Sequence, residues 1–257
     1  PRLFQTNLNF IKNFIFHILD NNSQDGTLEW ISSLHDKRIV LNTSDTSLSI
    51  EESWSRAKDL VLNEFVTFIG HDDILAPDYL AEMDKLISSN PDASLYQCHF
   101  DFIDNEGHII RPCLNMPEKL ESHELIEALF KRTIDTMGTG YMMRSADYKL
   151  LGGISTDYPA LLFADDELWL KLTQKRYLAI SKKKGFYYRK HMSASQTLHP
   201  EKYHKALVRY CYFLADFKST TEKNKNKIET YGHQLLMTYA KMLSHYLLRL
   251  PLKERSY

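Results

Sequence analysis

The first third of the chain alternates short apolar runs with segments of helical periodicity. Each apolar run is closed by polar or glycine residues, a pattern typical of buried strands that end in turns. The predicted strands are 14–19, 38–41 and 64–69, and the helices that follow them are 27–34, 49–62 and 77–89. This alternation predicts an α/β fold with a mostly parallel central sheet flanked by helices.

The pattern changes beyond residue 94. Two apolar segments, 95–103 and 108–111, flank the polar turn Asp104–Gly107 and predict a hairpin. The later elements are predicted as helices at 121–131 and 165–174 and strands at 141–144, 177–181 and 185–188. From Pro200 the pattern is helical, with a polar break at 219–227. We therefore predict an α/β domain over 1–199 and a helical C-terminal extension over 200–257.

Segment 235–250 carries apolar residues at helical spacing, interrupted by Lys241, His245 and Arg249. Such a stripe is typical of a helix that packs on a core. A homodimer contact and a peripheral membrane contact through the C-terminal helices are the alternatives.

Composition narrows the class of partner. The 257 residues are 43% hydrophobic and 25% charged, as in ordinary globular proteins. The formal net charge of −1 provides no basic field to gather nucleic acid. Three widely spaced cysteines predict neither a disulfide framework nor a metal site. No run approaches the roughly 18 apolar residues of a membrane span, so we expect a cytoplasmic protein, either freely soluble or peripheral at the inner membrane face.

The acidic pair Asp72–Asp73 directly follows the predicted strand 64–69. Ligands of open parallel sheets bind outside the carboxyl ends of the strands, and Asp20 lies at another such end. Carboxylates there can hold Mn²⁺ or Mg²⁺, which neutralises a diphosphate. An exposed acidic turn is the structural alternative, and the pair alone does not decide between the two.

Three polar segments occur in a specific order along the chain, at 20–27, 70–77 and 164–170. Supporting matches lie at Asn42, 53–57, 138–144, 151–153 and 188–195. Together, over roughly residues 1–199, they resemble the family-2 inverting glycosyltransferases of the GT-A fold, of the type that assembles bacterial surface polysaccharides.

The resemblance implies roles for individual residues. Asp72 matches the third position of the family's D-x-D motif, which is the metal ligand. The residues that match donor-binding positions are Asp20, Asn22, Arg56, Asp73, Arg189 and His191. Asp20 would bond the nucleotide base, and Arg189 and His191 would lie in a loop that closes over the diphosphate. A turn-capping role for Asp20 and a helix-surface role for Arg56 remain open.

The resemblance also implies a general base. Asp165 matches the family's catalytic aspartate, which takes the proton of the acceptor hydroxyl on the face of the sugar opposite the leaving group. Ala164 stands where the family has a glutamate, and Gly70 stands where it has the first aspartate of D-x-D. Asp166 or Glu167 would replace the charge missing at Ala164. The alternative for all these acids is a helix start stabilised by the helix dipole.

The opening strand of the family pattern has no counterpart in the sequence. Family members begin with an apolar strand and then a helix, and Pro1–Ile11 resembles only that helix. Loss of a central parallel strand would expose backbone groups and core surface. We therefore expect the first strand to lie outside the given sequence.

The function implied is transfer of a sugar, with inversion, from a nucleotide-diphosphate donor to a hydroxyl of a glycan or glycolipid acceptor. The donor is expected to be a UDP-sugar, with the divalent metal at Asp72 and the base at Asp165. The departures at Gly70 and Ala164 leave a catalytically inactive sugar-nucleotide-binding module as the alternative. A nucleotidyltransferase would require a glycine-rich loop with Arg or Lys near the start; none is visible, and that start is the part expected to lie outside the given sequence.

Overall fold

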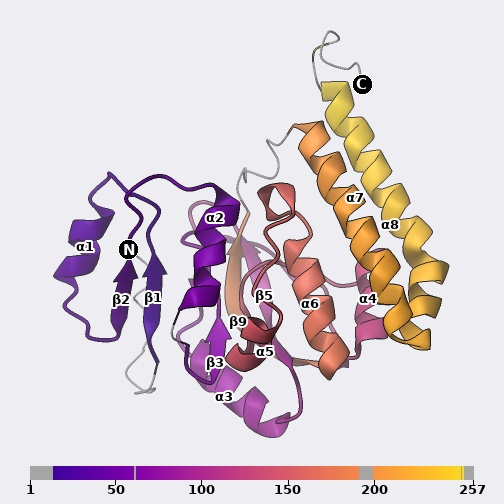
Figure 1. Ribbon diagram of the computed structural model, residues 1–257. Coiled ribbons are helices and arrows are strands. Elements are labelled where there is room, and N and C mark those ends of the chain that lie inside the picture. The colour runs from indigo at the N-terminus through magenta and orange to yellow at the C-terminus, as the bar shows by residue number, and fades with distance from the viewer. Residues whose placement is uncertain (1–13, 61, 191–198, 250, 252–257) are drawn as a thin grey trace.

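The computed structural model describes residues 14–60, 62–190, 199–249 and 251, and its elements follow the predicted order (Figure 1). The strands are β1 (Phe16–Leu19), β2 (Ile39–Asn42), β3 (Phe65–Thr67), β4 (Ile74–Leu75), β5 (Leu95–Ile103), β6 (Ile109–Pro112), β7 (Lys119–Leu120), β8 (Tyr141–Arg144) and β9 (Leu178–Arg189). The helices are α1 (Thr27–Ser33), α2 (Ile50–Ser55), α3 (Tyr79–Ser89), α4 (Ser122–Lys131), α5 (Ser145–Leu150), α6 (Ala164–Lys175), α7 (Pro200–Phe217) and α8 (Glu222–Arg249), with short 3₁₀ segments η3 (Arg56–Asp59), η4 (Pro159–Leu161) and η6 (Lys218–Thr220). The two strands predicted at 177–181 and 185–188 are one continuous strand, β9.

The α/β architecture with a helix-flanked central sheet is confirmed, but the prediction of a mostly parallel sheet is wrong for the described residues. The seven-stranded sheet has the order β3-β8-β5-β9-β4, with β6 paired to β5 and β7 paired to β9. Within it only β5 and β9 run parallel, and the other pairings are antiparallel. The turn after β5 is too short for a crossover and forces β6 to return antiparallel, and β8 enters between β3 and β5 in the opposite direction.

Strands β1 and β2 form a separate parallel pair. This pair and α1 lie at one side of the molecule, beside α2 (Figure 1). The Arg56 guanidinium joins the two parts, because it donates to the backbone oxygens of Asp20 (2.9 Å) and Asn42 (3.4 Å) at the ends of β1 and β2. Asp20 and Asp72 therefore follow strands of different sheets in the part of the chain that is described.

Helix α2 begins where the sequence predicted it, at Ser49. The Ser49 hydroxyl accepts from the backbone N–H of Glu52, and the Glu52 carboxylate accepts from the backbone N–H of Ser49 at 2.8 Å. This reciprocal pair satisfies two backbone donors that a helix start otherwise leaves open.

Helices cover both faces of the central sheet. Tyr79 and Met83 of α3 pack with Tyr96 and Cys98 of β5 on one face. On the other face α4, α6, α7 and α8 share one hydrophobic core with β5 and β9. The three cysteines are free, as predicted, and burial raises the pKa of the Cys98 thiol to about 12, so it stays protonated.

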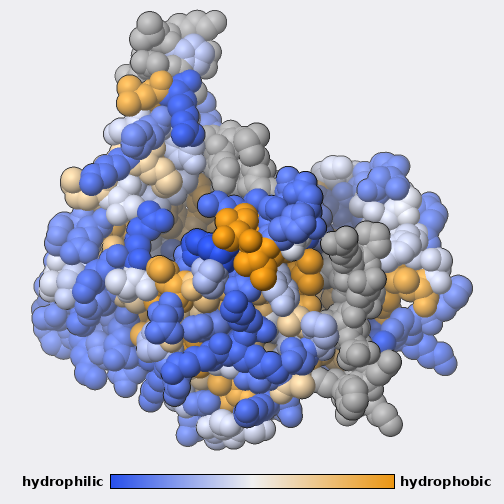
Figure 2. Space-filling view, turned by 180° about the vertical axis from the view of Figure 1, so that it is seen from behind, coloured by the Kyte–Doolittle hydropathy of each residue, from blue (hydrophilic) through white to orange (hydrophobic). Residues whose placement is uncertain are grey.

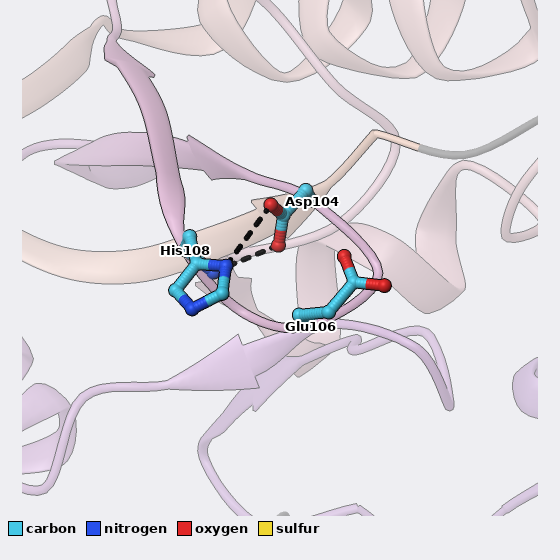
Figure 3. A group of neighbouring side chains, drawn as sticks. All are labelled: Asp104, Glu106 and His108. Carbon is cyan, nitrogen blue, oxygen red and sulfur yellow. Dashed lines mark hydrogen bonds and ion pairs between the residues drawn. The ribbon is translucent and has the colours of Figure 1, made fainter.

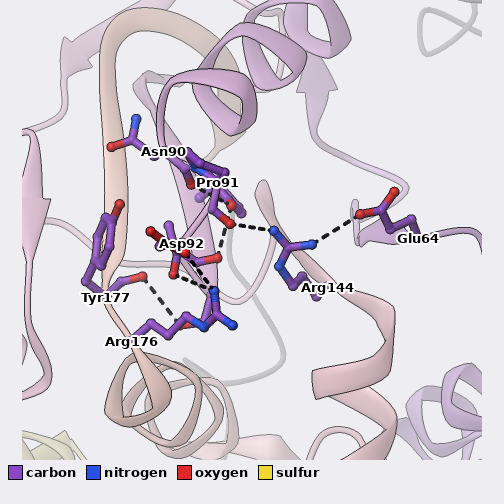
Figure 4. Close-up of polar contacts among 10 residues, drawn as sticks. Glu64, Asn90, Pro91, Asp92, Arg144, Arg176 and Tyr177 are labelled. Atoms are coloured by element: carbon purple, nitrogen blue, oxygen red, sulfur yellow. Dashed lines mark hydrogen bonds and ion pairs between the residues drawn. The ribbon is translucent and has the colours of Figure 1, made fainter.

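A polar network closes the sheet edge that lies away from Asp72 (Figure 4). Arg144, at the end of β8, donates to the Glu64 carboxylate just before β3 (3.2 Å) and to the Pro91 carbonyl after α3 (2.6 Å). Arg176, after α6, donates to the side chain and backbone of Asp92. These bonds fasten the turns at this edge, so that the loops at the opposite edge start from fixed strands.

The C-terminal helices pack on the central body rather than standing apart. Leu235 of α8 is buried, and Tyr239, Met242 and Tyr246 pack against the same core as α4 and α6. Core packing of segment 235–249 is thus confirmed. Other side chains such as Leu236 and Met237 stay exposed, and the face shown in Figure 2 is mostly hydrophilic with small apolar groups. In the part of the chain that is described, no helix has the length and apolarity to cross a membrane. The division of the chain at residue 199 stays a prediction.

The contact between α4 and α8 predicts a pH dependence of stability. Glu127 of α4 accepts from Lys227 of α8 at 2.5 Å and from Lys131 at 3.0 Å. These lysines lower the pKa of Glu127 from 4.5 to about 2. A carboxyl group with a lowered folded-state pKa stabilises the fold above its unfolded pKa, and this stabilisation is lost as pH falls from about 4.5 to about 2. Glu127→Gln should therefore lose less unfolding free energy than the native chain between pH 7 and pH 3, as measured by urea titration.

The control for this prediction is Glu229→Gln on α8, where the glutamate is half-exposed and lies 3.7 Å from Lys218. This variant should keep the native pH dependence. Equal acid sensitivity of Glu127→Gln and the native chain would contradict the prediction.

Candidate active site

The loop after β3 places two neighbouring carboxylates differently. Asp73 is buried, and its Oδ2 accepts from the Thr139 hydroxyl at 2.8 Å while its Oδ1 accepts from the Arg189 backbone N–H at 2.9 Å. Asp72 is half-buried. Asp73 therefore ties the loop to the start of β8 and the end of β9, and Asp72 is the better candidate for a ligand-binding carboxylate.

The backbone at Gly70 is closely approached by these carboxylates. A Cβ at position 70 would lie 2.5 Å from Asp72 Oδ1 and 3.3 Å from Asp73 Oδ2. Any larger residue would have to displace the Asp72 carboxylate from this position. The departure from the family pattern noted at Gly70 therefore coincides with a carboxylate that folds back against the backbone.

Arg189 fastens three segments at the same edge of the sheet. Its Nε donates to the Asp72 carbonyl at 2.7 Å, and a terminal nitrogen donates to the carbonyls of Asp104 (2.5 Å) and Asn105 (2.8 Å). These bonds hold the Asp72 loop against the β5–β6 turn. The predicted contact of Arg189 with a diphosphate stays a prediction, and His191 lies outside the described residues.

Asp165 lies in the first turn of α6, beside the segment that leads into β8. A Cβ at Gly138 would lie 3.4 Å from Asp165 Oδ2, which is ordinary van der Waals contact, so this segment lies directly beside the carboxylate. The neighbouring Thr139 bonds Asp73, and this links the predicted base to the predicted metal loop through two consecutive residues. Burial raises the pKa of Asp165, and burial together with the negative charge of Asp165 raises the pKa of Asp166.

The charges of three candidate acids act on the phenol of Tyr188 in β9. Burial, followed by the negative charges of Asp73, Asp72 and Asp165, raises the pKa of its phenol. Tyr188 directly precedes Arg189, whose backbone N–H donates to Asp73 Oδ1, so its phenol belongs to the surroundings of the acidic loop. Neither Tyr188 nor Thr139 was singled out from the sequence. Both belong to segments that carried the resemblance, and only their tertiary contacts distinguish them from the neighbouring residues.

The structure separates the two acids that follow Asp165. Glu167 is buried, accepts from the Tyr158 hydroxyl and from Lys171 Nζ at 2.5 Å each, and lies 3.5 Å from Arg209. Hydrogen bonds and an ion pair thus hold the Glu167 carboxylate in place. Asp166 is the acid that remains next to Asp165. Ala164 is completely buried, so the position of the expected glutamate is closed to a charged side chain here.

The remaining predicted donor residues lie at the ends of β1 and β2. Asp20 is buried, and its Oδ2 accepts from the Ser23 backbone N–H at 3.1 Å, which is a turn-capping contact. Asn22 adopts a φ of 61°, a conformation that asparagine tolerates, and its Oδ1 accepts from Gln24. Arg56 bonds the backbone of both strand ends. The capping role of Asp20 and the positioning role of Arg56 are therefore present, and their contacts with a nucleotide stay predictions.

One group of three side chains has the spacing of metal ligands among the residues that the structure describes. Asp104, Glu106 and His108, in the β5–β6 turn, place their ligand atoms within 4.8 Å of one another (Figure 3). The turn was predicted as a hairpin and not as a metal site. The His108 N–H and ring contact Asp104 at 2.8 and 3.3 Å, so the group also acts as an ordinary turn closure.

More than half of the sequence matches a family model. The model described as Glycosyl transferase family 2 matches residues 2–151. An uncharacterized glycosyltransferase, MJ1057 of Methanocaldococcus jannaschii, is 27% identical over 169 residues, which are 65% of this chain and 56% of that protein. The match thus spans little more than half of that relative's length.

Solved structures show the same fold at low identity. The crystal structure of residues 1–349 of S. aureus TarS has a TM-score of 0.65 and 13% identity, and the match covers 94% of this chain and 67% of that one. The structure of the same protein in complex with UDP-GlcNAc has a TM-score of 0.64 and 14% identity, and the match covers 94% of this chain and 68% of that one. Because matches that cover 94% of this chain extend beyond residue 199, the C-terminal helices are part of the shared fold.

Proposed function

Because this chain belongs to glycosyl transferase family 2, we propose that it transfers a sugar from a UDP-sugar to a hydroxyl of a glycan or lipid-linked acceptor, with inversion. The observation that carries the proposal is the link from Asp73 through Thr139 and Gly138 to Asp165, which unites the loop of the acidic motif with the candidate base. The UDP-GlcNAc complex of the structurally similar TarS supports a UDP-sugar as donor. We also propose a cytoplasmic location, either freely soluble or peripheral at the inner membrane face.

Asp165 acts as the general base in this proposal. Its carboxylate accepts the proton of the acceptor hydroxyl as that oxygen bonds to the anomeric carbon and the bond from this carbon to the diphosphate oxygen breaks. Burial, which raises the pKa of Asp165, makes the carboxylate a stronger base than one in water.

Asp72 is the residue proposed to hold Mn²⁺ or Mg²⁺. Mg²⁺-type sites commonly use one or two carboxylates and complete their ligand shell with substrate phosphates, so a single half-buried aspartate fits a metal that arrives with the diphosphate. When bound, the metal neutralises charge on the departing diphosphate. Asp73 supports the loop, and Asp20, Asn22, Arg56, Arg189 and His191 are proposed to contact the donor.

A sugar-nucleotide-binding module without catalysis is the second candidate. Gly70 and Ala164 favour it, because each lacks a carboxylate of the resembled motif. Retention of Asp72 and of Asp165 with its raised pKa favours the enzyme.

A screen of nucleotide sugars by thermal shift with Mn²⁺ tests the proposal. A ligand that binds only the folded state raises its apparent stability, so a UDP-sugar should raise the Tm in a manner that depends on Mn²⁺. Release of UDP from the best ligand, with and without oligosaccharide or lipid acceptors, then measures turnover. The alternative of an inactive module would be supported by three results together. UDP would bind, no UDP-sugar would be turned over, and Asp165→Asn would change neither result.

A further inference from the structure

An aromatic clamp from the C-terminal helices encloses the residue that precedes α6. The Phe163 ring stacks on Tyr210 of α7, with centroids 4.9 Å apart and an interplanar angle of 8°. Tyr239 of α8 and Tyr203 of α7 meet the same ring edge-on, at 4.8 and 6.0 Å. Stacked and edge-to-face rings stabilise a fold by more than the burial of their apolar area alone. We call Tyr203, Tyr210 and Tyr239 the aromatic clamp.

The segment inside this clamp has a strained backbone. Ala160, Leu161 and Phe163 have φ values of 55°, 56° and 68°, in the left-handed region that residues other than glycine rarely adopt. Such conformations persist only where the surrounding structure holds them, and they concentrate at functional sites. On the side away from the clamp, the Ala160 N–H donates to the Glu51 carboxylate of α2 at 2.7 Å.

A second contact joins α6 to α7 at Glu167, the residue that follows the acidic pair Asp165–Asp166. Glu167 accepts from Tyr158 and Lys171 and lies 3.5 Å from Arg209, the neighbour of Tyr210 in the chain. Asp165 and Asp166 therefore lie between two points at which α7 holds α6. The Tyr210 hydroxyl is buried and has no hydrogen-bond partner among the residues that the structure describes, and burial followed by the charge of Asp166 raises the pKa of this phenol. The clamp thus reaches the immediate surroundings of the acidic pair.

We propose that the aromatic clamp holds the strained turn 160–163 and thereby positions the Asp165 carboxylate for proton abstraction. Phe163 and Tyr210 are positioning residues in this proposal, and the helices beyond residue 199 are working parts of the active site. The inference rests on the proposed function, because it assigns these residues to the base of that reaction. It also explains why a turn with three unfavourable φ values directly precedes α6.

Steady-state kinetics of two clamp variants tests the inference. Tyr210→Leu and Phe163→Leu remove ring stacking but keep apolar side chains. A reacting group displaced by about 1 Å can cost about 100-fold in rate, so kcat should fall by about 10- to 100-fold. The Kd for UDP with Mn²⁺ should stay within about twofold of the native value, because the ring contacts of the clamp are with Phe163 and with other rings of α7 and α8.

Two further variants serve as controls. Tyr210→Phe keeps the ring and should keep kcat within about twofold of native, as a conservative rescue of Tyr210→Leu. Phe217→Leu removes a buried ring of the same helix that contacts Phe213, and the folded protein should keep native kcat. If the clamp variants lower kcat no more than Phe217→Leu does, or weaken UDP binding as much as they lower kcat, the inference is wrong.

Hydrogen exchange separates failure of the inference from failure of the proposed function. The amides of residues 160–167 should lose protection in Tyr210→Leu and Phe163→Leu, and should keep it in Phe217→Leu. Unchanged protection in all variants would overturn the clamp whatever the activity. A native protein that binds UDP without turnover would refute the proposed function and with it the role of the clamp in positioning a base, even if protection falls.

Discussion

Asp165→Asn should lower kcat for sugar transfer by about 10²- to 10⁴-fold, the range that a general base contributes. Asparagine has nearly the same shape but cannot accept a proton from the acceptor hydroxyl. The space beside Gly138 accepts the side chain in either form, so the fold should stay intact. UDP release in the presence of acceptor measures kcat, and calorimetric titration with UDP and Mn²⁺ should give an affinity close to native.

The neighbouring acid provides the matched control. Asp166→Asn removes a carboxylate whose pKa is also raised from the same helical turn but should leave most of the activity. Because the charge of Asp165 raises the pKa of Asp166, Asp165 loses its proton while Asp166 is still neutral. The acid limb of the kcat profile should therefore stay close to that of the native protein. A larger loss of kcat in Asp166→Asn than in Asp165→Asn would assign the general base to Asp166.

Asp72→Asn should abolish the Mn²⁺-dependent part of UDP binding. An amide oxygen carries no net charge and is a weaker ligand for a hard cation than a carboxylate oxygen. The Kd for UDP measured with Mn²⁺ should rise to the value measured with a chelator, a change of at least about tenfold if the metal contributes about 1.4 kcal/mol or more. Unchanged affinity with Mn²⁺ would remove the metal role from Asp72.

Asp73→Asn is the contrasting variant at the adjacent position. The Asp73 carboxylate accepts from the Thr139 hydroxyl and from the Arg189 backbone, and an asparagine leaves one buried donor poorly matched. A buried group left unsatisfied costs about 1–3 kcal/mol, so the unfolding free energy should fall by about this amount. Urea titration should thus show a loss of stability for Asp73→Asn that exceeds the loss for Asp72→Asn. The reverse order would show that Asp72 is the structural member of the pair.

The Asp104, Glu106 and His108 group bears on these experiments because Arg189 joins its turn to the Asp72 carbonyl. Two of its three side chains are exposed. Metal bound by this group would still bind in Asp72→Asn, whereas metal that binds at Asp72 together with the nucleotide would not. Titrating Mn²⁺ with and without UDP in the same variant therefore distinguishes the two locations.

Much of the local structure follows from the sequence. The apolar runs before Asp20 and Gly70 became β1 and β3, the turn Asp104–Gly107 joined β5 to β6, and Ser49 with Glu52 began α2. These features depend on neighbours within a few residues, which a sequence pattern displays directly. The direction of β8 does not, because its pairing with both β3 and β5 is decided by contacts far apart in the chain.

The same distinction holds for the site. The sequence by itself determined the family resemblance and the candidate acids Asp20, Asp72 and Asp165, because the ordered motifs are local and their residue types carry the chemistry. Only the tertiary structure decided that Asp73 is a structural tie, that Glu167 is held by Tyr158 and Lys171, and that Phe163 lies within rings of the last two helices. Burial and the partner of each carboxylate set its role, and both arise from segments that meet only when the chain is folded.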